Sequence, residues 1–255
     1  MIKVENLVKS FNNVTVLDDI SVNFEKGKTN LIIGRSGSGK TVLMKCIVGL
    51  YDADGGSVFF DNRNFLEMDF TDRKNLRREM GMLFQGSALF DSLNVEENVM
   101  FPLNMFTRMT LEEKRERTNF CLKRVNLENV NKLFPGELSG GMKKRVAIAR
   151  AIVQNPKYLF CDEPNSGLDP KTALVIDDLI SEITHEYTIT TVINTHDMNS
   201  VMEIGEKVIF IHEGNKGWEG TREDIFDSDD YHLNDFIFAS NFAKKLKLLT
   251  NKQNS

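Results

Sequence analysis

The sequence has few of the residues that would tie it to a secreted, metal-stabilised or membrane-spanning fold. Its only cysteines are Cys46, Cys121 and Cys161, which are far apart and form no C-x-x-C pair. An odd number of scattered cysteines excludes a disulfide framework and a structural zinc site, so we expect small core residues in a reducing compartment. No apolar run approaches the roughly 20 residues of a membrane-spanning helix, and the first residues alternate like a strand, unlike a signal peptide. We therefore expect a cytosolic chain that reaches a membrane only through a partner.

The sequence also lacks an excess of positive charge. The 255 residues include 32 Lys and Arg against 37 Asp and Glu, which gives a net charge of −5. This balance argues against a dedicated nucleic-acid-binding protein, because such proteins need a cationic face for phosphate contacts. With 41% hydrophobic and 27% charged residues, the chain can bury one large core or two small ones.

Two hydrophobic patterns follow one another along the chain. Alternating stretches in the first sixty or so residues predict antiparallel strands, namely IKVEN, ISVNF and SVFFD. Continuous apolar runs predict buried parallel strands that alternate with helices, namely TNLIIG, KYLFCDEP, ITTVIN and KVIFIH. The pattern of residues 71–155 is mostly helical, and Thr110 and Glu113 have the spacing of a capping box. The tail after Thr221 predicts one or two helices with a frayed end.

One glycine-rich segment lies between a predicted strand and a predicted helix. Its sequence, GRSGSGKT, satisfies the phosphate-binding pattern G-x-x-x-x-G-K-[ST]. Glycines there let backbone N–H groups surround a triphosphate at a helix N-terminus, where an anion is favoured. Lysine neutralises the phosphate charge and threonine offers its hydroxyl to Mg²⁺. The nucleotide-binding residues expected in this segment are Gly34, Ser36, Gly37, Ser38, Gly39, Lys40 and Thr41.

Two adjacent acids follow the buried run YLFC. Asp162 lies at the carboxyl end of the predicted strand, where ligands collect in open α/β sheets, and can bind Mg²⁺ directly or through water. Glu163 could polarise the attacking water. Taken alone, two such acids could equally be a solvated strand end. Together with the phosphate-binding segment they favour a catalytic site.

The segment GELSGGMKKR places two glycines in otherwise helical sequence, where each costs about 1 kcal/mol relative to alanine. Ser139 can cap the helix that follows, and the N–H groups around Gly140 and Gly141 then form an anion site at its positive end. The chain therefore has two phosphate-binding elements. They could serve one nucleotide within the chain or belong to different nucleotides, and spacing alone leaves both open.

In this order, the motifs resemble those of the ATP-binding subunits of ABC transporters over roughly residues 1–222. GRSGSGKT is similar to the Walker A motif, LSGGM to the signature motif and YLFCDEP to the Walker B motif. Phe11 resembles the aromatic residue that stacks on adenine, and Gln85 in MLFQGSALF resembles the Q-loop glutamine. SGLDP, with Asp169, is similar to the D-loop, and NTHD, with His196, to the switch-histidine region.

The resemblance implies a fold and a division of the chain. The fold is an α/β P-loop NTPase (RecA-like) core with an N-terminal antiparallel β subdomain and an inserted α-helical subdomain. The ATP-binding domain would span residues 1–222, with the helical subdomain at about 86–155. Residues 223–255 would form a C-terminal helical tail.

The resemblance also implies a mechanism, which is ATP hydrolysis by in-line attack of water with Mg²⁺ present. Glu163 would be the base, Lys40 and His196 would stabilise the developing charge, and Gln85 would contact Mg²⁺ or the water. Two subunits would pair head to tail, so that Ser139–Gly141 of one close over the ATP held by Lys40 of the other. The D-loop Asp169 would line the interface between them.

Within the family, the segments FQGSALF, ENVMFPL and LSGGMKKRVAIARA resemble most the ATPases of Mce-associated lipid transporters, including the Mla phospholipid-trafficking systems. There a methionine such as Met142 is common after the two glycines. This branch implies permease subunits that dock on residues 85–101 and a substrate-binding component of Mce type. The resemblance to ABC ATP-binding subunits as a whole implies a peripheral position at the cytoplasmic face of the inner membrane.

Other interpretations stay open. Amino-acid, methionine and lipoprotein-release ATPases share much of the same pattern and are the alternative. A non-transport ABC ATPase that acts on DNA or ribosomes is disfavoured, because the chain shows no coiled-coil insertion and no second ATP module. A nucleotide-gated regulator without turnover is disfavoured because Glu163 and His196 are both present.

Overall fold

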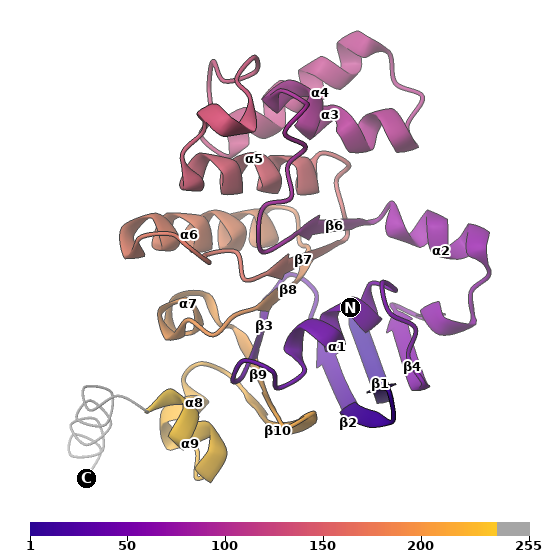
Figure 1. The fold of residues 1–255 in the computed structure, drawn as a ribbon, viewed down its shortest axis with the longest axis vertical. Helices are drawn as coiled ribbons and strands as arrows, with labels where there is room; N and C mark the ends of the chain where they lie inside the picture. Colours follow the sequence, from indigo (N-terminus) through magenta and orange to yellow (C-terminus); the bar gives the residue numbers. More distant parts are fainter. Residues whose placement is uncertain (239–255) are drawn as a thin grey trace.

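The computed structural model describes residues 1–238, which build two sheets and the helices around them (Figure 1). In this part of the chain one sheet has the strand order β2-β1-β4-β5 and the other the order β10-β9-β3-β8-β7-β6. The strands are β1 (Ile2–Phe11), β2 (Val14–Phe24), β3 (Thr29–Ile33), β4 (Gly55–Phe60), β5 (Arg63–Asn64), β6 (Met80–Leu83), β7 (Tyr158–Asp162), β8 (Thr190–Asn194), β9 (Lys207–His212) and β10 (Asn215–Gly220).

The first sheet is antiparallel, as the alternating sequence predicted. Strand β1 pairs with β2 on one side and with β4 on the other, with Val4 opposite both Val22 and Val58. Alternate residues point to one face, where Val4, Val58 and Phe60 are buried. That face packs on Leu43 of helix α1 (Lys40–Ile47) in one apolar cluster.

The second sheet is parallel except at β10, and its inner strands are buried on both faces. Alternate residues of β7 pack into different apolar clusters on the two faces of the sheet. Phe160 packs with the first sheet and α1, whereas Leu159 packs with the helices on the other face. Continuous apolar runs therefore formed buried parallel strands, as predicted. Strand β6 is a correction, because it lies in sequence predicted to be mostly helical. Its four residues are too few to show a period, and they become a strand by pairing with β7.

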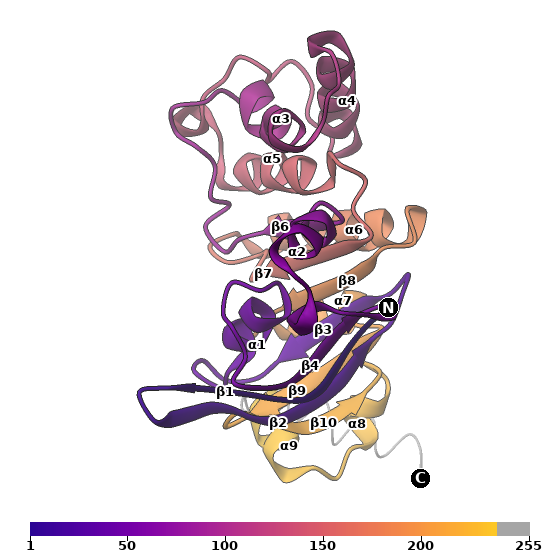
Figure 2. The same ribbon diagram turned by 90° about the vertical axis from the view of Figure 1, so that its right-hand side faces the viewer.

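The remaining helices are α2 (Phe70–Arg77), α3 (Val95–Phe106), α4 (Leu111–Arg124), α5 (Gly140–Ile152), α6 (Pro170–Glu186), α7 (Met198–Ile204), α8 (Asp224–Asp227) and α9 (Tyr231–Ile237), with 3₁₀ turns at Phe65–Glu67 and Pro135–Glu137. Helices α3, α4 and α5 form a block at the far end from the first sheet in both views (Figures 1 and 2). The predicted capping box at the start of α4 is confirmed: Thr110 N donates to Glu113 Oε2 at 2.6 Å, and Glu113 N to Thr110 Oγ1 at 3.3 Å.

Helices α8 and α9 lie in the predicted tail, and the boundary at residue 222 stays a prediction. The frayed end predicted for the tail falls in residues 239–255, outside the described residues. All three cysteines are buried, as expected. None of the helices in residues 1–238 is long and apolar enough to cross a bilayer.

Candidate functional site

The glycine-rich segment connects β3 to α1 in a backbone path that only glycine allows at key points. Gly34, Gly37 and Gly39 have φ values of 149°, 80° and 109°. A Cβ on Gly34 would lie 2.2 Å from the carbonyl oxygen of Ile211, whereas one on Gly37 would meet nothing within 4 Å. The loop therefore packs tightly against the sheet at Gly34, whereas the space beside Gly37 is unoccupied. Such a loop presents backbone N–H groups to a ligand at the N-terminus of α1.

Lys40 begins α1 and folds back across this loop. Its Nζ donates to the carbonyl oxygens of Gly34 at 2.8 Å and Arg35 at 3.0 Å, and the side chain is buried. Burial lowers the pKa of Lys40, and the negative charges of Glu163 and Asp162 act in the opposite direction.

A second polar group of the loop is also buried and lacks a partner. Ser38 Oγ has no hydrogen-bond partner within residues 1–238. A buried polar atom without a partner is costly unless a ligand satisfies it. With the lysine ammonium and the open glycine loop, this hydroxyl fits the triphosphate of ATP.

Asp162 ends β7 and faces Thr41 across the sheet edge. Thr41 Oγ1 lies 3.4 Å from Asp162 Oδ1, which also accepts a hydrogen bond from Asn194 Nδ2 at 3.0 Å. Hydroxyl and carboxylate oxygens are the ligands that Mg²⁺ prefers, so Thr41 and Asp162 fit a magnesium site beside the phosphate loop. Gln85, the third expected metal ligand, lies elsewhere, against Glu163.

Three predicted catalytic residues meet at one carboxylate. Glu163 Oε2 accepts a hydrogen bond from Gln85 Nε2 at 2.8 Å, and its Oε1 lies 3.1 Å from His196 Nδ1. Glu163 adopts φ 47° and donates its backbone N–H to the carbonyl oxygen of Asn194 at 3.0 Å. Backbone strain of this kind is common at functional sites, where neighbouring structure holds it in place.

Sequence reasoning missed several residues that hold this arrangement. Lys144 of α5 is buried, and its Nζ donates to the backbone carbonyl oxygens of Gln85 and Glu163. Arg150, also on α5, donates to the carbonyl oxygens of Ser87 and Ala88, which follow Gln85. The only sequence signal was a run of basic residues in a helix, which usually indicates a solvated face.

Ser139 caps α5 as predicted, because its Oγ accepts a hydrogen bond from Met142 N at 3.2 Å. The adjoining glycines lie against the segment before α6: a Cβ on Gly140 would be 3.4 Å from Leu168, and one on Gly141 would be 2.7 Å from Thr172. Ser139–Gly141, of which Ser139 and Gly140 are exposed, therefore lies beside the D-loop. In the described residues it makes no hydrogen bond with the phosphate-binding segment of the same chain.

Asp169 caps α6, where it accepts a hydrogen bond from Thr172 N at 3.0 Å. Hydrogen bonds from Thr172 lower the pKa of Asp169. Phe11, at the end of β1, is partly exposed and meets the ring of Tyr51 edge-on at 5.3 Å. Lys9 Nζ lies over this ring, 5.1 Å from its centroid, and the exposed part of Phe11 fits stacking on a planar base.

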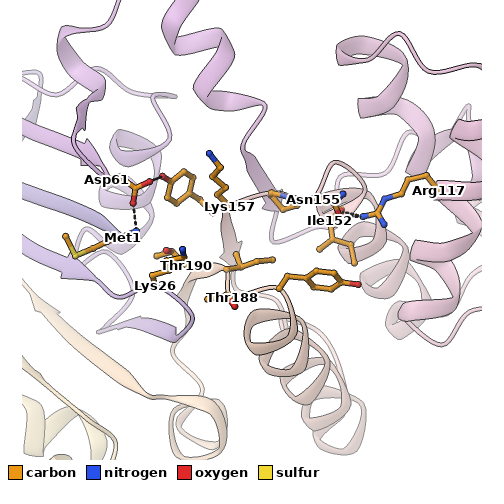
Figure 3. A pocket seen from close by; sticks show the side chains of 13 residues that line it. Met1, Lys26, Asp61, Arg117, Ile152, Asn155, Lys157, Thr188 and Thr190 are labelled. Carbon is orange, nitrogen blue, oxygen red and sulfur yellow. Dashed lines mark hydrogen bonds and ion pairs between the residues drawn. The ribbon is translucent and has the colours of Figure 1, made fainter.

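A cavity of about 290 Å³ lies away from these residues, at the start of β7 and β8 (Figure 3). Its polar wall includes Asp61, which accepts hydrogen bonds from the Tyr158 hydroxyl at 2.7 Å and from the Met1 ammonium at 2.8 Å. None of the predicted site residues lines it. The candidate site is therefore the opposite edge, where β3, β7 and β8 end.

A family model described as ABC transporter matches residues 17–166. The chain is 37% identical to the methionine import ATP-binding protein MetN of Campylobacter jejuni, over 95% of this chain and 77% of that protein. It is 34% identical to the probable ribonucleotide transport ATP-binding protein mkl of Mycobacterium leprae, over 92% of this chain and 68% of that protein.

Solved structures agree with the sequence relatives. A dimeric bacterial ABC transporter cassette is 34% identical, with a TM-score of 0.80 over 87% of this chain and 99% of that one. Another structure of that cassette is a post-hydrolysis state bound to ADP and Pi. The cbiO1 protein of Clostridium perfringens, part of the ABC transporter complex cbiONQ, is 29% identical, with a TM-score of 0.83 over 98% of both chains. These likenesses confirm the predicted α/β fold with its antiparallel β subdomain and helical insert.

Proposed function

Because this chain belongs to the ATP-binding proteins of ABC transporters, we propose that it drives a membrane permease as one half of a head-to-tail dimer. The chain is an ATPase, and it uses ATP and Mg²⁺. The single observation that carries the proposal is the convergence of Gln85, His196 and Lys144 on Glu163 next to the phosphate-binding segment.

Each residue at this edge has a role that its contacts support. ATP supplies the phosphoryl group that is transferred to water, and Mg²⁺ neutralises part of its charge. Lys40 and the backbone of the glycine-rich segment bind the phosphates, with Thr41 and Asp162 as the metal ligands. The Glu163 carboxylate takes the proton from the attacking water, while Gln85 and His196 orient its two oxygens.

The dimer follows from the position of the second phosphate-binding element. Ser139 caps α5, Gly140 and Gly141 lie beside Leu168 and Thr172, and in the described residues none of the three bonds to the chain's own Lys40 segment. An anion site at the N-terminus of a 13-residue helix can then serve a nucleotide held by a second copy. The dimeric structure of the related cassette supports this arrangement.

The dimer is tested with Glu163→Gln, which keeps the shape of the side chain but cannot take a proton. We expect ATP hydrolysis to fall at least about 100-fold while the variant runs as a dimer in gel filtration only when ATP is present. Glu186→Gln, on the exposed end of α6, is the matched control. A Glu163→Gln variant that stays monomeric with saturating ATP would contradict the composite site.

The permease is proposed to dock on the surface of residues 85–101. A groove of about 390 Å³ there is lined by aromatic side chains of the β6–α3 region, including Phe84, Phe90 and Phe101. Phe84 and Phe90 are both exposed. Exposed aromatic groups in a groove are typical of protein–protein contacts. Phe90→Asp should abolish co-purification with the permease and leave ATP binding intact.

For the transported molecule, we propose an amino-acid importer of the methionine type. The curated relatives named as methionine import proteins are 36–39% identical, and they favour this alternative over lipid trafficking. Lipid trafficking is the second candidate, favoured by Met142 after the two glycines. The Mce-type component belongs to that candidate, whereas a peripheral position at the cytoplasmic face of the inner membrane is proposed for both candidates.

A tagged pull-down from mild-detergent membranes separates the two candidates. Mass spectrometry identifies the co-purifying membrane subunit and any enriched lipid. An amino-acid-type permease without lipid enrichment supports import, and methionine should then stimulate ATP hydrolysis by the complex. A Mce-type component with enriched phospholipid would contradict the importer and support lipid trafficking.

A further inference from the structure

Helix α6 buries one carboxyl group that the site described above does not use. Asp177 is 1% exposed, and its Oδ1 has no hydrogen-bond partner in the described chain. The same holds for Oδ1 of the neighbouring Asn165. Burying such oxygens is costly, so a carboxyl persists in this place only where it is useful.

The Asp177 carboxyl lies at the junction of three segments. Asn165, two residues after Glu163, and Ser200 in α7 are the polar side chains next to this carboxyl. Asn165 Nδ2 also donates to Ser200 Oγ at 3.1 Å. These contacts tie the start of the D-loop, the middle of α6 and helix α7 to one another.

Each of the tied segments leads directly to the hydrolysis site. Helix α7 begins one residue after Asp197, its N-cap, which follows His196 in the chain. The D-loop continues from Asn165 to Leu168, which lies against Gly140 of the signature segment. A shift of either segment at Asp177 therefore reaches His196 or the second phosphate-binding element.

We propose that Asp177 is a positioning residue that acts through Asn165 and Ser200 to hold the D-loop and α7 together, and so sets where His196 lies against Glu163. The inference rests on the proposed roles of His196 and Glu163 in hydrolysis. It adds a residue that touches neither the nucleotide nor the reacting water.

The strength of this link depends on the charge of Asp177. Burial raises the pKa of Asp177 to about 6, and the negative charges of Asp197 and Asp178 act in the same direction, against the hydrogen bonds from Ser200 and Asn165. Burial raises the pKa of the Cys161 thiol in β7, and the negative charge of Asp177 acts in the same direction. The α5 cation nearby, Lys144, acts on Cys161 and binds the Gln85 and Glu163 carbonyl oxygens.

Hydrogen bonds to a charged acceptor are roughly twice as strong as those between neutral groups. The link should therefore be tight above pH 6, where Asp177 is ionised, and looser below. Asp177→Asn keeps the size and the hydrogen-bonding capacity of the side chain but fixes it in the neutral state.

The test compares the ATP hydrolysis of the purified full chain and of Asp177→Asn from about pH 5 to about pH 8. At about pH 5 the variant should match the unchanged protein, and at about pH 8 its kcat should be about 5-fold lower, with KM for ATP changed less than about 2-fold.

Glu182→Gln is the matched control, because Glu182 lies on the same helix, is exposed and pairs with Arg124. Its rate ratio should stay flat with pH. The inference would be overturned if the ratio of the Asp177→Asn rate to the rate of the unchanged protein stayed the same at every pH. A change in KM for ATP without a change in kcat would overturn it as well. Glu163→Gln distinguishes failure of this inference from failure of the proposed function. If Glu163→Gln hydrolyses ATP normally, the proposed catalytic site is wrong, and the inference about Asp177 is wrong with it.

Discussion

The side-chain amide of Gln85 donates a hydrogen bond to the Glu163 carboxylate at 2.8 Å, although 78 positions of sequence separate the two residues. His196 reaches the other oxygen of the same carboxylate at 3.1 Å. Lys144 binds the backbone carbonyl oxygens of both Gln85 and Glu163. A change in any of these segments therefore displaces one shared carboxylate.

Replacing His196 by alanine should lower kcat for ATP hydrolysis by about 100-fold, because Glu163 loses the group that orients Oε1. KM for ATP should change little, since the phosphate-binding segment is untouched. Steady-state ATPase assays check both values. His185→Ala is the control, because His185 pairs with Glu206 far from Glu163, and equal losses in the two variants would refute the assignment.

Lys144→Met should lower kcat about 10-fold with an unchanged KM, because the Gln85 and Glu163 carbonyl oxygens lose the cation that joins them. Methionine keeps most of the buried volume, so the fold should survive. Lys143→Met changes the neighbouring side chain, which makes no such contact in the described chain, and it should retain full activity. Normal turnover by Lys144→Met would show that α5 does not position the catalytic groups.

Gly34→Ala should destabilise the fold by about 3 kcal/mol or more, because its Cβ would lie 2.2 Å from the Ile211 carbonyl oxygen and φ is 149°. Gly136→Ala is the matched control, since a Cβ there meets nothing within 4 Å. Urea unfolding monitored by circular dichroism gives both free energies of unfolding. Similar values for the two variants would contradict the close contact.

At neutral pH and above, Asp177→Asn should raise the free energy of unfolding although it lowers kcat. The pKa of Asp177 is raised from 3.8 to about 6, so its protonated form contributes stability that is complete below pH 3.8 and lost as pH rises through about 6. The asparagine variant avoids this loss, and at about pH 7.5 its free energy of unfolding should exceed that of the unchanged protein by about 2 kcal/mol.

Near pH 4 the two unfolding free energies should converge, which urea titrations at both pH values can measure. A variant that is both less stable and less active at about pH 7.5 would indicate a purely structural role for Asp177.

Met142→Gln should keep ATPase activity within several-fold. The signature segment offers backbone N–H groups to phosphate, and the contact of Met142 with the cap runs from its backbone N to Ser139 Oγ. ATPase assays at saturating ATP test this. Near-complete loss would mean that the Met142 side chain takes part in the site.

The local motifs and the buried strands could be predicted from the sequence, because their patterns repeat within a few residues. GRSGSGKT, the acids after β7 and the Ser139 cap all depend on neighbours in the chain, and the structure placed each in the expected local setting. Strand β6 was missed, since its four residues become a strand only by pairing with Tyr158–Cys161.

The supporting residues could not be predicted for the same physical reason. Asn194 meets Asp162 across 32 positions, and Lys144 meets Gln85 across 59. Buried polar side chains like these are rare, but nothing local distinguishes them from a solvated amide or lysine. The burial of Asp177 could not be predicted either, because in the sequence it is one of two adjacent acids on an amphipathic helix.

Helix α5 joins the signature segment to the side chains that hold the catalytic groups. Its first residues cap an anion site, Lys144 holds the catalytic carbonyl oxygens, and Arg150 holds Ser87 and Ala88 near the proposed permease groove. Thirteen helical residues span about 20 Å and contain no hinge that could absorb a displacement. In the proposed dimer, α5 therefore couples the nucleotide bound by the partner to the catalytic groups of its own chain. The two sites would then hydrolyse ATP in a coupled manner and not independently.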